Sequence, residues 1–269
     1  MKSIAELIDL TGRRALITGG AGHIGFAIAE ALAELGSVVA LADRDGDACR
    51  RRVGELTARG GGRAIALLFD LADEHATRAA CKAAISELGG LDIFVHAAAF
   101  VGTTQVGGWS VPFERQSVEA WDAGMRVNLT SAFVIAQEAR AALAASRHGS
   151  IILVSSIYGM VGSDAAVYGE TGMNPDRVLA YSASKGGLLQ VMRHLSALFA
   201  PDIRVNALSP GGVARNQPEL FQQKYSARTP LKRMATEEDM KGAAAYLASD
   251  LSAYVTGHNL IVDGGWTAW

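Results

Sequence analysis

The sequence predicts a doubly wound α/β fold, with a parallel sheet of about seven strands in a single domain over residues 1–269. Short runs rich in Val, Ile, Leu and Ala alternate with longer stretches of helical periodicity. The short runs are apolar along their whole length, which is typical of strands buried on both faces of a parallel sheet. No internal repeat or low-complexity linker interrupts the alternation, so we expect one core.

The predicted elements follow one another in strict alternation. The strands are expected at residues 14–18, 37–42, 63–69, 91–97, 150–156, 203–209 and 259–264. Helical periodicity covers residues 23–35, 46–59, 73–88, 116–146, 179–200 and 236–248, and the fourth of these helices is expected to be broken. In such a sheet the ligand crevice lies at the carboxyl ends of the strands.

Three glycine-containing segments do not fit the alternation. Residues 100–116 and 157–178 are long and polar, and each follows a predicted strand on the crevice side. Long ordered loops in a compact domain usually carry function, so we expect both to shape a substrate pocket. Residues 210–235 contain several prolines and glycines and are expected to form a mobile lid.

Composition and charge exclude several classes of protein. The formal net charge is −2 and the sequence pI is about 6.3, so no basic surface for nucleic acid is expected. Cys49 and Cys81 fall in helical stretches and suggest no disulfide framework, which favours a reducing compartment. Neither a signal-peptide core nor an apolar run of roughly 20 residues is found, so a cytoplasmic protein without membrane partners is predicted. His96, His148 and His194 lack metal-site spacing, and no metal is predicted.

The segment TGGAGHIG, residues 18–25, joins the first predicted strand to the first long helix. Glycines at this point let a backbone turn approach a pyrophosphate, which the amides at the helix N-terminus then bind. The cofactor-binding residues expected here are Gly19, Gly22, His23, Ile24 and Gly25. His23 is either a phosphate ligand when protonated or a solvated loop histidine.

Acidic residues end the second and third predicted strands. Asp43 lies 18 residues after Gly25, where a carboxylate can accept hydrogen bonds from both adenosine ribose hydroxyls and repel a 2′-phosphate. NAD is therefore predicted in preference to NADP. Asp43 is alternatively a turn residue, and the neighbouring Arg44 is a possible ligand for a 2′-phosphate. Asp70, followed by Leu71, either contacts the adenine or caps the next helix.

The segment YSASK, residues 181–185, opens a predicted helix and places Tyr181 and Lys185 one turn apart on one face. A cation beside a phenol favours the phenolate, so tyrosine can act as acid or base nearer neutral pH. The pair follows a strand that ends in Ser155 and Ser156, and it precedes IRVNALSPGG.

Over essentially its whole length, the chain resembles the short-chain dehydrogenase/reductase family. The resemblance rests on TGGAGHIG, Asp43, Asp70-Leu71, VNLT with Asn128, ILVSS, YSASK, RVNALSPGG and LIVDGG. It implies a Rossmann-type fold, hydride transfer at the nicotinamide C4, and a homotetramer. It further implies cofactor contacts at Ala97, Tyr181, Lys185, Pro210, Gly211 and Val213.

The resemblance also implies a role for each of four catalytic residues. Tyr181 moves the proton of the alcohol or carbonyl, and Ser156 hydrogen-bonds the substrate oxygen. Lys185 binds the nicotinamide ribose and lowers the pKa of Tyr181. Asn128 positions a water of the proton relay.

The spacing of the catalytic residues departs from the family pattern. Ser156 and Tyr181 lie 25 residues apart, farther than the family usually places them. Tyr168 is a nearer candidate for the catalytic base, but Gly172 stands where the lysine would be needed, so Tyr168 is rejected. The insertion is expected to face the substrate, and it contains Tyr168, Glu170, Asn174 and Arg177.

Three further departures concern the coenzyme site. Residues 96–99 read HAAA where the family commonly has Asn-Asn-Ala-Gly, so support for the adenosine ribose and the central helix is expected partly from elsewhere. The segment after Pro210 lacks a threonine that often binds the nicotinamide amide, and backbone groups or Asn216 are expected to replace it. The glycine spacing matches a longer sugar-nucleotide branch, so Gly22 is expected to be the flexible position, with His23 in the first helical turn.

The substrate is predicted to be hydroxyl-rich: a sugar, a sugar acid or a polyol. The tail NLIVDGGWTAW is similar to that of sugar-acid dehydrogenases, and segments around YSASK and RNQPELF are similar to glycan-modification dehydrogenases. Trp109, Ser156, Tyr168, Glu170 and Asn216 are the expected substrate contacts, and Trp266 and Trp269 are either sugar-stacking residues or subunit anchors. The alternatives are a reductase of an apolar or acyl-chain ketone and a non-catalytic dinucleotide sensor, although such sensors tend to lack the Tyr/Lys pair.

Overall fold

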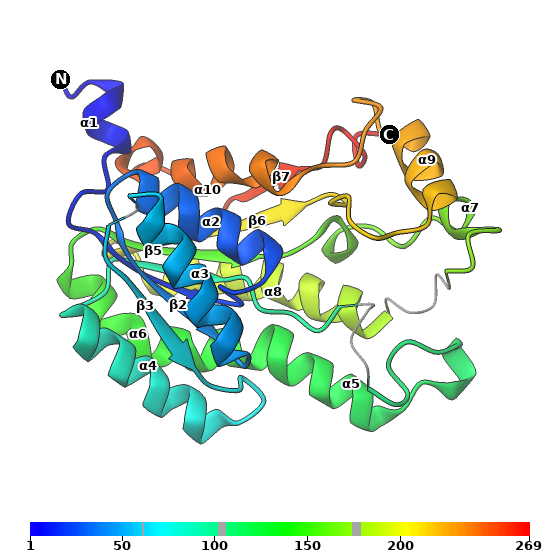
Figure 1. The fold of residues 1–269 in the computed structure, drawn as a ribbon, viewed down its shortest axis with the longest axis horizontal. Helices are drawn as coiled ribbons and strands as arrows, with labels where there is room; N and C mark the ends of the chain where they lie inside the picture. The colour runs from blue at the N-terminus through cyan, green and yellow to red at the C-terminus, as the bar shows by residue number, and fades with distance from the viewer. Residues whose placement is uncertain (61, 102–105, 174–178) are drawn as a thin grey trace.

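The chain forms a seven-stranded parallel sheet, as predicted (Figure 1). A computed structural model describes residues 1–60, 62–101, 106–173 and 179–269. The strand order is β3-β2-β1-β4-β5-β6-β7, so the order reverses between β1 and β4. The strands are β1 (Arg14–Thr18), β2 (Val38–Asp43), β3 (Ala64–Leu68), β4 (Ile93–His96), β5 (Gly149–Val154), β6 (Ile203–Pro210) and β7 (Asn259–Val262).

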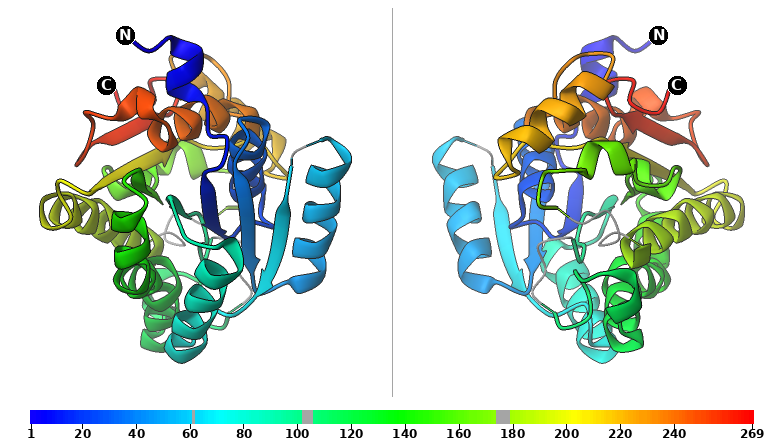
Figure 2. Two further views of the ribbon diagram at one scale, coloured as in Figure 1. Left: turned by 90° about the vertical axis from the view of Figure 1, so that its left-hand side faces the viewer. Right: turned by 90° about the vertical axis from the view of Figure 1, so that its right-hand side faces the viewer.

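Helices cover both faces of the sheet (Figure 2). One layer consists of α2 (His23–Glu34), α3 (Gly46–Ala58) and α10 (Lys241–Ala248). The other consists of α4 (Glu74–Leu88), α5 (Val118–Met125), α6 (Ser131–Ala145) and α8 (Leu179–Leu198). Each predicted helix therefore overlaps an observed one. Short helices α1 (Ile4–Ile8), α7 (Ala165–Tyr168) and α9 (Glu219–Arg228) complete the described part of the chain, apart from single 3-10 turns.

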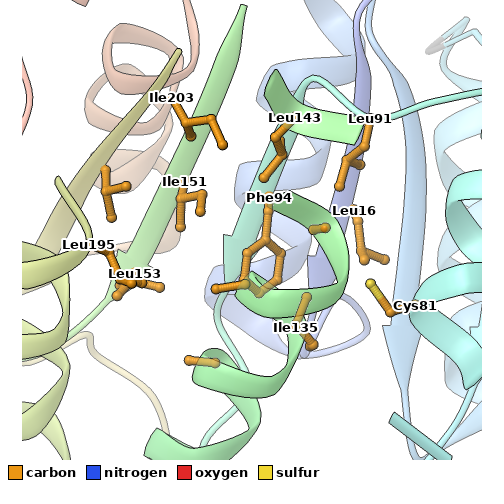
Figure 3. Packing of buried hydrophobic residues seen from close by; sticks show 14 of the residues in the cluster. Leu16, Cys81, Leu91, Phe94, Ile135, Leu143, Ile151, Leu153, Leu195 and Ile203 are labelled. Atoms are coloured by element: carbon orange, nitrogen blue, oxygen red, sulfur yellow. The ribbon is translucent and has the colours of Figure 1, made fainter. Parts of the chain in front are cut away.

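Each face of the sheet has its own apolar core. Figure 3 shows part of the larger one, in which Phe94 of β4 lies between Ile135 of α6 and Ile151 of β5. Its members are nearly all fully buried, because helices cover both faces of the central strands. The two layers fix the sheet rigidly, so the strand ends that carry the polar residues are held in place.

The break expected in helix 116–146 is a π turn. A π-helical segment, η2 (Arg126–Thr130), connects α5 directly to α6, and its middle residue is Asn128. Such turns insert one extra residue into a helix and release a backbone carbonyl from its usual partner. The break is therefore a local change of hydrogen bonding within one long helix.

The segment 210–235 is partly helical. It contains α9, which packs against α7 on the far side of the crevice from the sheet. The C-terminus comes to the same place, since the Arg228 guanidinium donates to the carbonyl of Trp269 over 3.1 Å. No helix in the described ranges combines the length and apolarity needed to cross a membrane.

Candidate active site

A cavity of about 1100 Å³ lies at the carboxyl ends of the strands. The loops after β1, β2, β3, β4, β5 and β6 all contribute to its lining, together with α8 and α9. The predicted cofactor residues line it without exception: Gly19, Gly22, His23, Ile24, Gly25, Asp43, Arg44, Asp70, Leu71, Ala97, Tyr181, Lys185, Pro210, Gly211 and Val213. Residues spread over most of the sequence therefore meet in one space.

Several positions of the glycine loop have no space for a side chain, most clearly Gly19 and Gly25. Gly19 has φ +66°, and a Cβ atom there would lie 2.6 Å from the Cα of Ala98. A Cβ on Gly25 would collide with the carbonyl oxygen of Gly19. Gly22 has φ −74°, so the expectation that Gly22 is the flexible position is wrong, because the left-handed conformation belongs to Gly19.

The N-terminus of α2 is open toward the cavity. Gly22 is its N-cap residue and offers no side-chain hydrogen bond to the first amides, so these remain available to an anion. His23 is the first residue of α2, as expected, and its Nδ1 lies 3.4 Å from Glu237 Oε1. Burial, followed by the charge of Arg215, lowers the pKa of His23. The first amides of α2 therefore have no side-chain cap, and His23 lies beside them.

The two acidic residues at the strand ends both line the cavity. Asp43 ends β2, and its Oδ1 accepts a hydrogen bond from the amide of Asp45 over 3.3 Å. Asp70 accepts one from the amide of Ala72 over 2.9 Å, whereas the N-cap of α4 is Asp73. The capping role considered for Asp70 thus belongs to Asp73.

Ser156, Tyr181 and Lys185 converge on the cavity. Ser156 lies two residues after the end of β5, and its side chain is close enough to Tyr181 to lower the pKa of the phenol. Lys185 lies one turn after Tyr181 in α8, with its Nζ 5.6 Å from the centre of the phenol ring. The same ammonium donates to the carbonyl of Val154 over 2.7 Å. The strand end and the helix therefore position all three groups.

Burial has the largest effect on the pKa values of Tyr181 and Lys185. It lowers the pKa of Lys185 to about 7, and it raises the pKa of Tyr181. The nearby Ser156 hydroxyl and the charge of Arg215 lower the pKa of Tyr181 but do not outweigh burial. The net effect in this structure therefore differs from the lowered tyrosine pKa that the resemblance implies.

Asn128 lies behind the cavity, fully buried in the π turn. Its Oδ1 accepts from the amide of Phe100 over 2.6 Å, and its Nδ2 donates to Ser184 Oγ over 2.9 Å. The Ser184 hydroxyl in turn donates to the carbonyl of Tyr181 over 2.7 Å. Asn128 therefore ties the loop after β4 to the helix that carries Tyr181.

His96 supports the same π turn. It is fully buried at the end of β4, with Nδ1 2.9 Å from Thr18 Oγ1 and Nε2 3.3 Å from the carbonyl oxygen of Asn128. Because a carbonyl only accepts, Nε2 carries the proton and Nδ1 accepts from the threonine. Burial, followed by the charge of Lys185, lowers the pKa of His96 to about 3. His96 therefore supplies part of the support for the central helix from within HAAA, and the expectation that the remaining support comes from elsewhere stays a prediction.

The predicted substrate contacts divide into two groups. Ser156, Tyr168 and Asn216 line the cavity. Trp109 does not: it is buried against Gly124, and its Nε1 donates to the carbonyl of Val101 over 2.8 Å. The Glu170 side chain is 85% exposed and lies 3.5 Å from Lys224 Nζ, outside the cavity lining. Asn174 and Arg177 lie outside the described residues.

Sequence reasoning missed an aromatic wall at the end of the cavity away from the glycine loop. We define this wall as Tyr158, Tyr168, Phe221 and Tyr225, all of which line the cavity. The ring of Tyr168 lies 5.3 Å from that of Phe221, which lies 5.9 Å from that of Tyr225. Trp266 stacks on Tyr225 from behind and is buried, so it supports the wall. The only sequence signal for the aromatic wall is the presence of bulky residues within 157–178 and 210–235.

No cluster of three or more His, Cys, Asp or Glu side chains able to hold a metal ion occurs within the described residues.

Comparisons with known proteins agree with the geometry. A family model described as "Enoyl-(Acyl carrier protein) reductase" matches residues 19–267. The chain is 33% identical to a 2,5-dichloro-2,5-cyclohexadiene-1,4-diol dehydrogenase from Sphingobium indicum, covering 96% of this chain and 97% of that protein.

Two solved structures are also similar over nearly the whole chain. One, from Beutenbergia cavernae, is assigned as an NAD(P)-dependent gluconate 5-dehydrogenase, with TM-score 0.85, 32% identity and coverage of 97% and 99% of the two chains. The other is the NADPH-dependent 3-quinuclidinone reductase of Rhodotorula rubra, with TM-score 0.85, 30% identity and coverage of 100% and 96%.

Proposed function

This chain belongs to the short-chain dehydrogenase/reductase family, and on that premise we propose that it uses NAD to interconvert a secondary alcohol and a ketone on a hydroxyl-rich molecule. A sugar, a sugar acid or a polyol is the proposed substrate. One observation carries the proposal: Ser156, Tyr181 and Lys185 converge on the cavity that also contains the glycine loop and Asp43.

The chain's residues fit a dinucleotide. Gly19 and Gly25 let the loop fold tightly beside the open N-terminus of α2, where a pyrophosphate would bind, and a Cβ at either glycine would collide with the backbone of the loop or of residues 97–98. Asp43 and Asp70 lie where the adenosine half would extend. When bound, the nicotinamide accepts or donates the hydride.

The catalytic residues hold the substrate oxygen and move its proton. Ser156 donates a hydrogen bond to this oxygen, and the Tyr181 hydroxyl takes up or supplies the proton. Lys185, next to the phenol, favours the phenolate while it is protonated. Asn128 and His96 hold the π turn against the catalytic helix, so the phenol keeps its position.

Asp43 supports NAD as the coenzyme. Its carboxylate lines the cavity at the end of β2, where it would repel a 2′-phosphate. Arg44 is also on the lining and exposed, which would favour NADP if its guanidinium turned inward. Steady-state kinetics with both coenzymes test this point: we expect a higher kcat/KM with NAD, and a higher value with NADP would contradict the role given to Asp43.

The aromatic wall supports a substrate with a ring. Aromatic faces pack against the apolar face of a ring, and the hydroxyls of Tyr158, Tyr168 and Tyr225 can bond its oxygens. A second candidate is an apolar or acyl-chain ketone. Phe221, Met173 and Met234 favour it, because they add apolar surface at the same end of the cavity.

The test is NADH formation at alkaline pH from sugar acids, polyols and nucleotide sugars, with simple secondary alcohols and hydroxyacyl compounds alongside. Turnover of the hydroxyl-rich compounds would support the proposal, and turnover of the apolar compounds alone would favour the second candidate. Tyr181→Phe is the control, expected to lower kcat by roughly 10²–10⁴-fold while NAD still binds. If it retained activity, the role of Tyr181 would be wrong.

We also propose a homotetramer. Support comes from two separate sets of exposed apolar side chains: Val118 and Phe133 on the α5–α6 helix, and Ile261 on the edge strand β7. Two different self-complementary contacts are what a tetramer with dihedral symmetry requires. Light scattering coupled to size-exclusion chromatography would measure the mass directly, and a monomer would contradict the proposal.

A further inference from the structure

Two tyrosine hydroxyls in the aromatic wall form a pair that the catalytic steps above do not use. Tyr158 Oη and Tyr168 Oη lie 2.6 Å apart, and both side chains line the cavity. Tyr158 belongs to the turn after β5, whereas Tyr168 ends the short helix α7 inside the insertion. The insertion therefore brings a second phenol against the catalytic strand.

The pair has one hydrogen-bond donor left over. Each phenol carries one O–H, and only one of the two protons can lie in the bond between them. Within the described residues, neither hydroxyl has a further hydrogen-bond partner. An unused O–H in a mostly apolar surrounding costs free energy unless a ligand accepts from it. The pair therefore offers one donor to whatever occupies the cavity.

Both phenols remain protonated donors at working pH. Burial raises the pKa of Tyr158 and of Tyr168 above the ordinary value, and the pairing of the two raises that of Tyr158 further. Either hydroxyl can be the donor within the pair, and the other then keeps a proton for a ligand.

The pair lies beside the reacting groups. The amide of Tyr158 donates to Ser156 Oγ over 3.2 Å, so the turn that fixes Ser156 also fixes Tyr158. Tyr168 is close enough to Tyr181 to act on its pKa. The tyrosine pair therefore lines the same cavity as Ser156 and Tyr181, within electrostatic reach of Tyr181.

We propose that Tyr158 and Tyr168 form a specificity site that donates one hydrogen bond to an oxygen on the carbon next to the reacting carbon. The substrate class is then a ring with two adjacent hydroxyls, or the matching α-hydroxy ketone in the reverse direction. The tyrosine pair binds this second oxygen, and the ring carbons pack on Phe221. This inference rests on the proposed function and narrows its substrate.

A pair of matched alcohols tests the inference. 1,2-Cyclohexanediol, as its cis and trans isomers, and cyclohexanol share one ring and differ by one hydroxyl. The measured quantity is the ratio of kcat/KM for the better diol to kcat/KM for cyclohexanol, with NAD as coenzyme. Tyr168→Phe and Tyr158→Phe remove one hydroxyl each, and Tyr254→Phe, which changes a fully exposed phenol, is the control.

We expect the unmodified protein to prefer a diol and Tyr168→Phe to lower the ratio about 10-fold, the loss of roughly one hydrogen bond. The ratio isolates this hydrogen bond, because a packing change that acts equally on both alcohols cancels in it. The affinity for NAD should stay unchanged in this variant. An unchanged ratio, or an equal loss for both alcohols, would overturn the inference, because the pair would then serve only the packing of α7.

A binding measurement separates this inference from the proposed function. Quenching of NADH fluorescence gives the affinity of the protein–NADH complex for 2-hydroxycyclohexanone and for cyclohexanone. If no alcohol is oxidised but the hydroxy ketone binds more tightly, and Tyr168→Phe removes the difference, the specificity site stands and the proposed reaction fails. If alcohols are oxidised but the two ketones bind equally, the proposed function stands and the inference fails.

Discussion

The two ends of the cavity are built in different ways. At the coenzyme end, Gly19, Gly25 and the N-terminus of α2 form the wall from backbone, within eight consecutive residues. At the substrate end, the wall consists of side chains from the turn after β5, the insertion and α9. Backbone recognition needs a local sequence, whereas the aromatic wall needs segments that meet only after folding.

This difference in construction determines which amino-acid substitutions each end of the cavity can tolerate. A backbone cradle accepts almost no added atom, since a Cβ at Gly25 already overlaps a carbonyl oxygen. An aromatic wall can exchange one side chain for another of similar volume at a modest cost. We therefore expect substitutions at the coenzyme end to be poorly tolerated. Substitutions at the substrate end should be tolerated and should change the substrate specificity.

Lys185 lies between the coenzyme end and the substrate end of the cavity. Lys185→Met should lower the activity more than the substitutions at either end. Activity should fall by roughly 10²–10⁴-fold, because the ammonium beside the phenol ring is lost. The variant should nevertheless be more stable at pH 7, since it removes a cation that burial disfavours. Differential scanning calorimetry over a range of pH measures this gain.

The pH dependence of that gain has a definite sign. Burial lowers the pKa of Lys185 from 10.5 to about 7, so the folded state resists protonation that the unfolded chain accepts. The cost to the unmodified protein is complete below pH 7 and disappears as the pH rises toward 10.5. The Tm advantage of Lys185→Met should shrink over the same interval, and an advantage that grew with pH would contradict the burial of a titrating lysine.

Gly25→Ala and Gly22→Ala should separate the two kinds of glycine in the loop. A methyl group at Gly25 meets the Gly19 carbonyl, so we expect a loss of about 1–3 kcal/mol in stability and weak NAD binding. At Gly22 the nearest atom to the added Cβ is the same oxygen at 3.2 Å, and φ is −74°. Equal effects of the two substitutions, measured by urea unfolding and NAD titration, would contradict this account of the cradle.

Phe221→Leu should have the smallest effect and should act at the substrate end alone. The substitution keeps an apolar side chain but removes the ring that contacts Tyr168 at 5.3 Å and Tyr225 at 5.9 Å. We expect KM for a ring substrate to rise several-fold while KM for NAD stays constant. If KM for NAD changed equally, the two ends of the cavity would not be independent.

Much of the fold and of the coenzyme end could be predicted from the sequence. The apolar runs located all seven strands, and YSASK placed Tyr181 and Lys185 on one face of a helix. These predictions succeed because the periodicity of a helix or a strand depends on residues that are consecutive in the sequence. The same reasoning misplaced Trp109, because a tryptophan in a polar loop can pack inward against Gly124 as readily as it can line a pocket.

The sequence by itself determined the order of the elements, the position of the glycine loop and the placement of Tyr181 and Lys185 on one face of a helix. Only the tertiary structure decided that His96 holds the carbonyl of Asn128 in a π turn, and that Tyr158 meets Tyr168 across the insertion. Local periodicity and turn chemistry act between near neighbours in the chain. Contacts between distant segments depend on how the sheet and its two helix layers pack. No short sequence pattern predicts that packing.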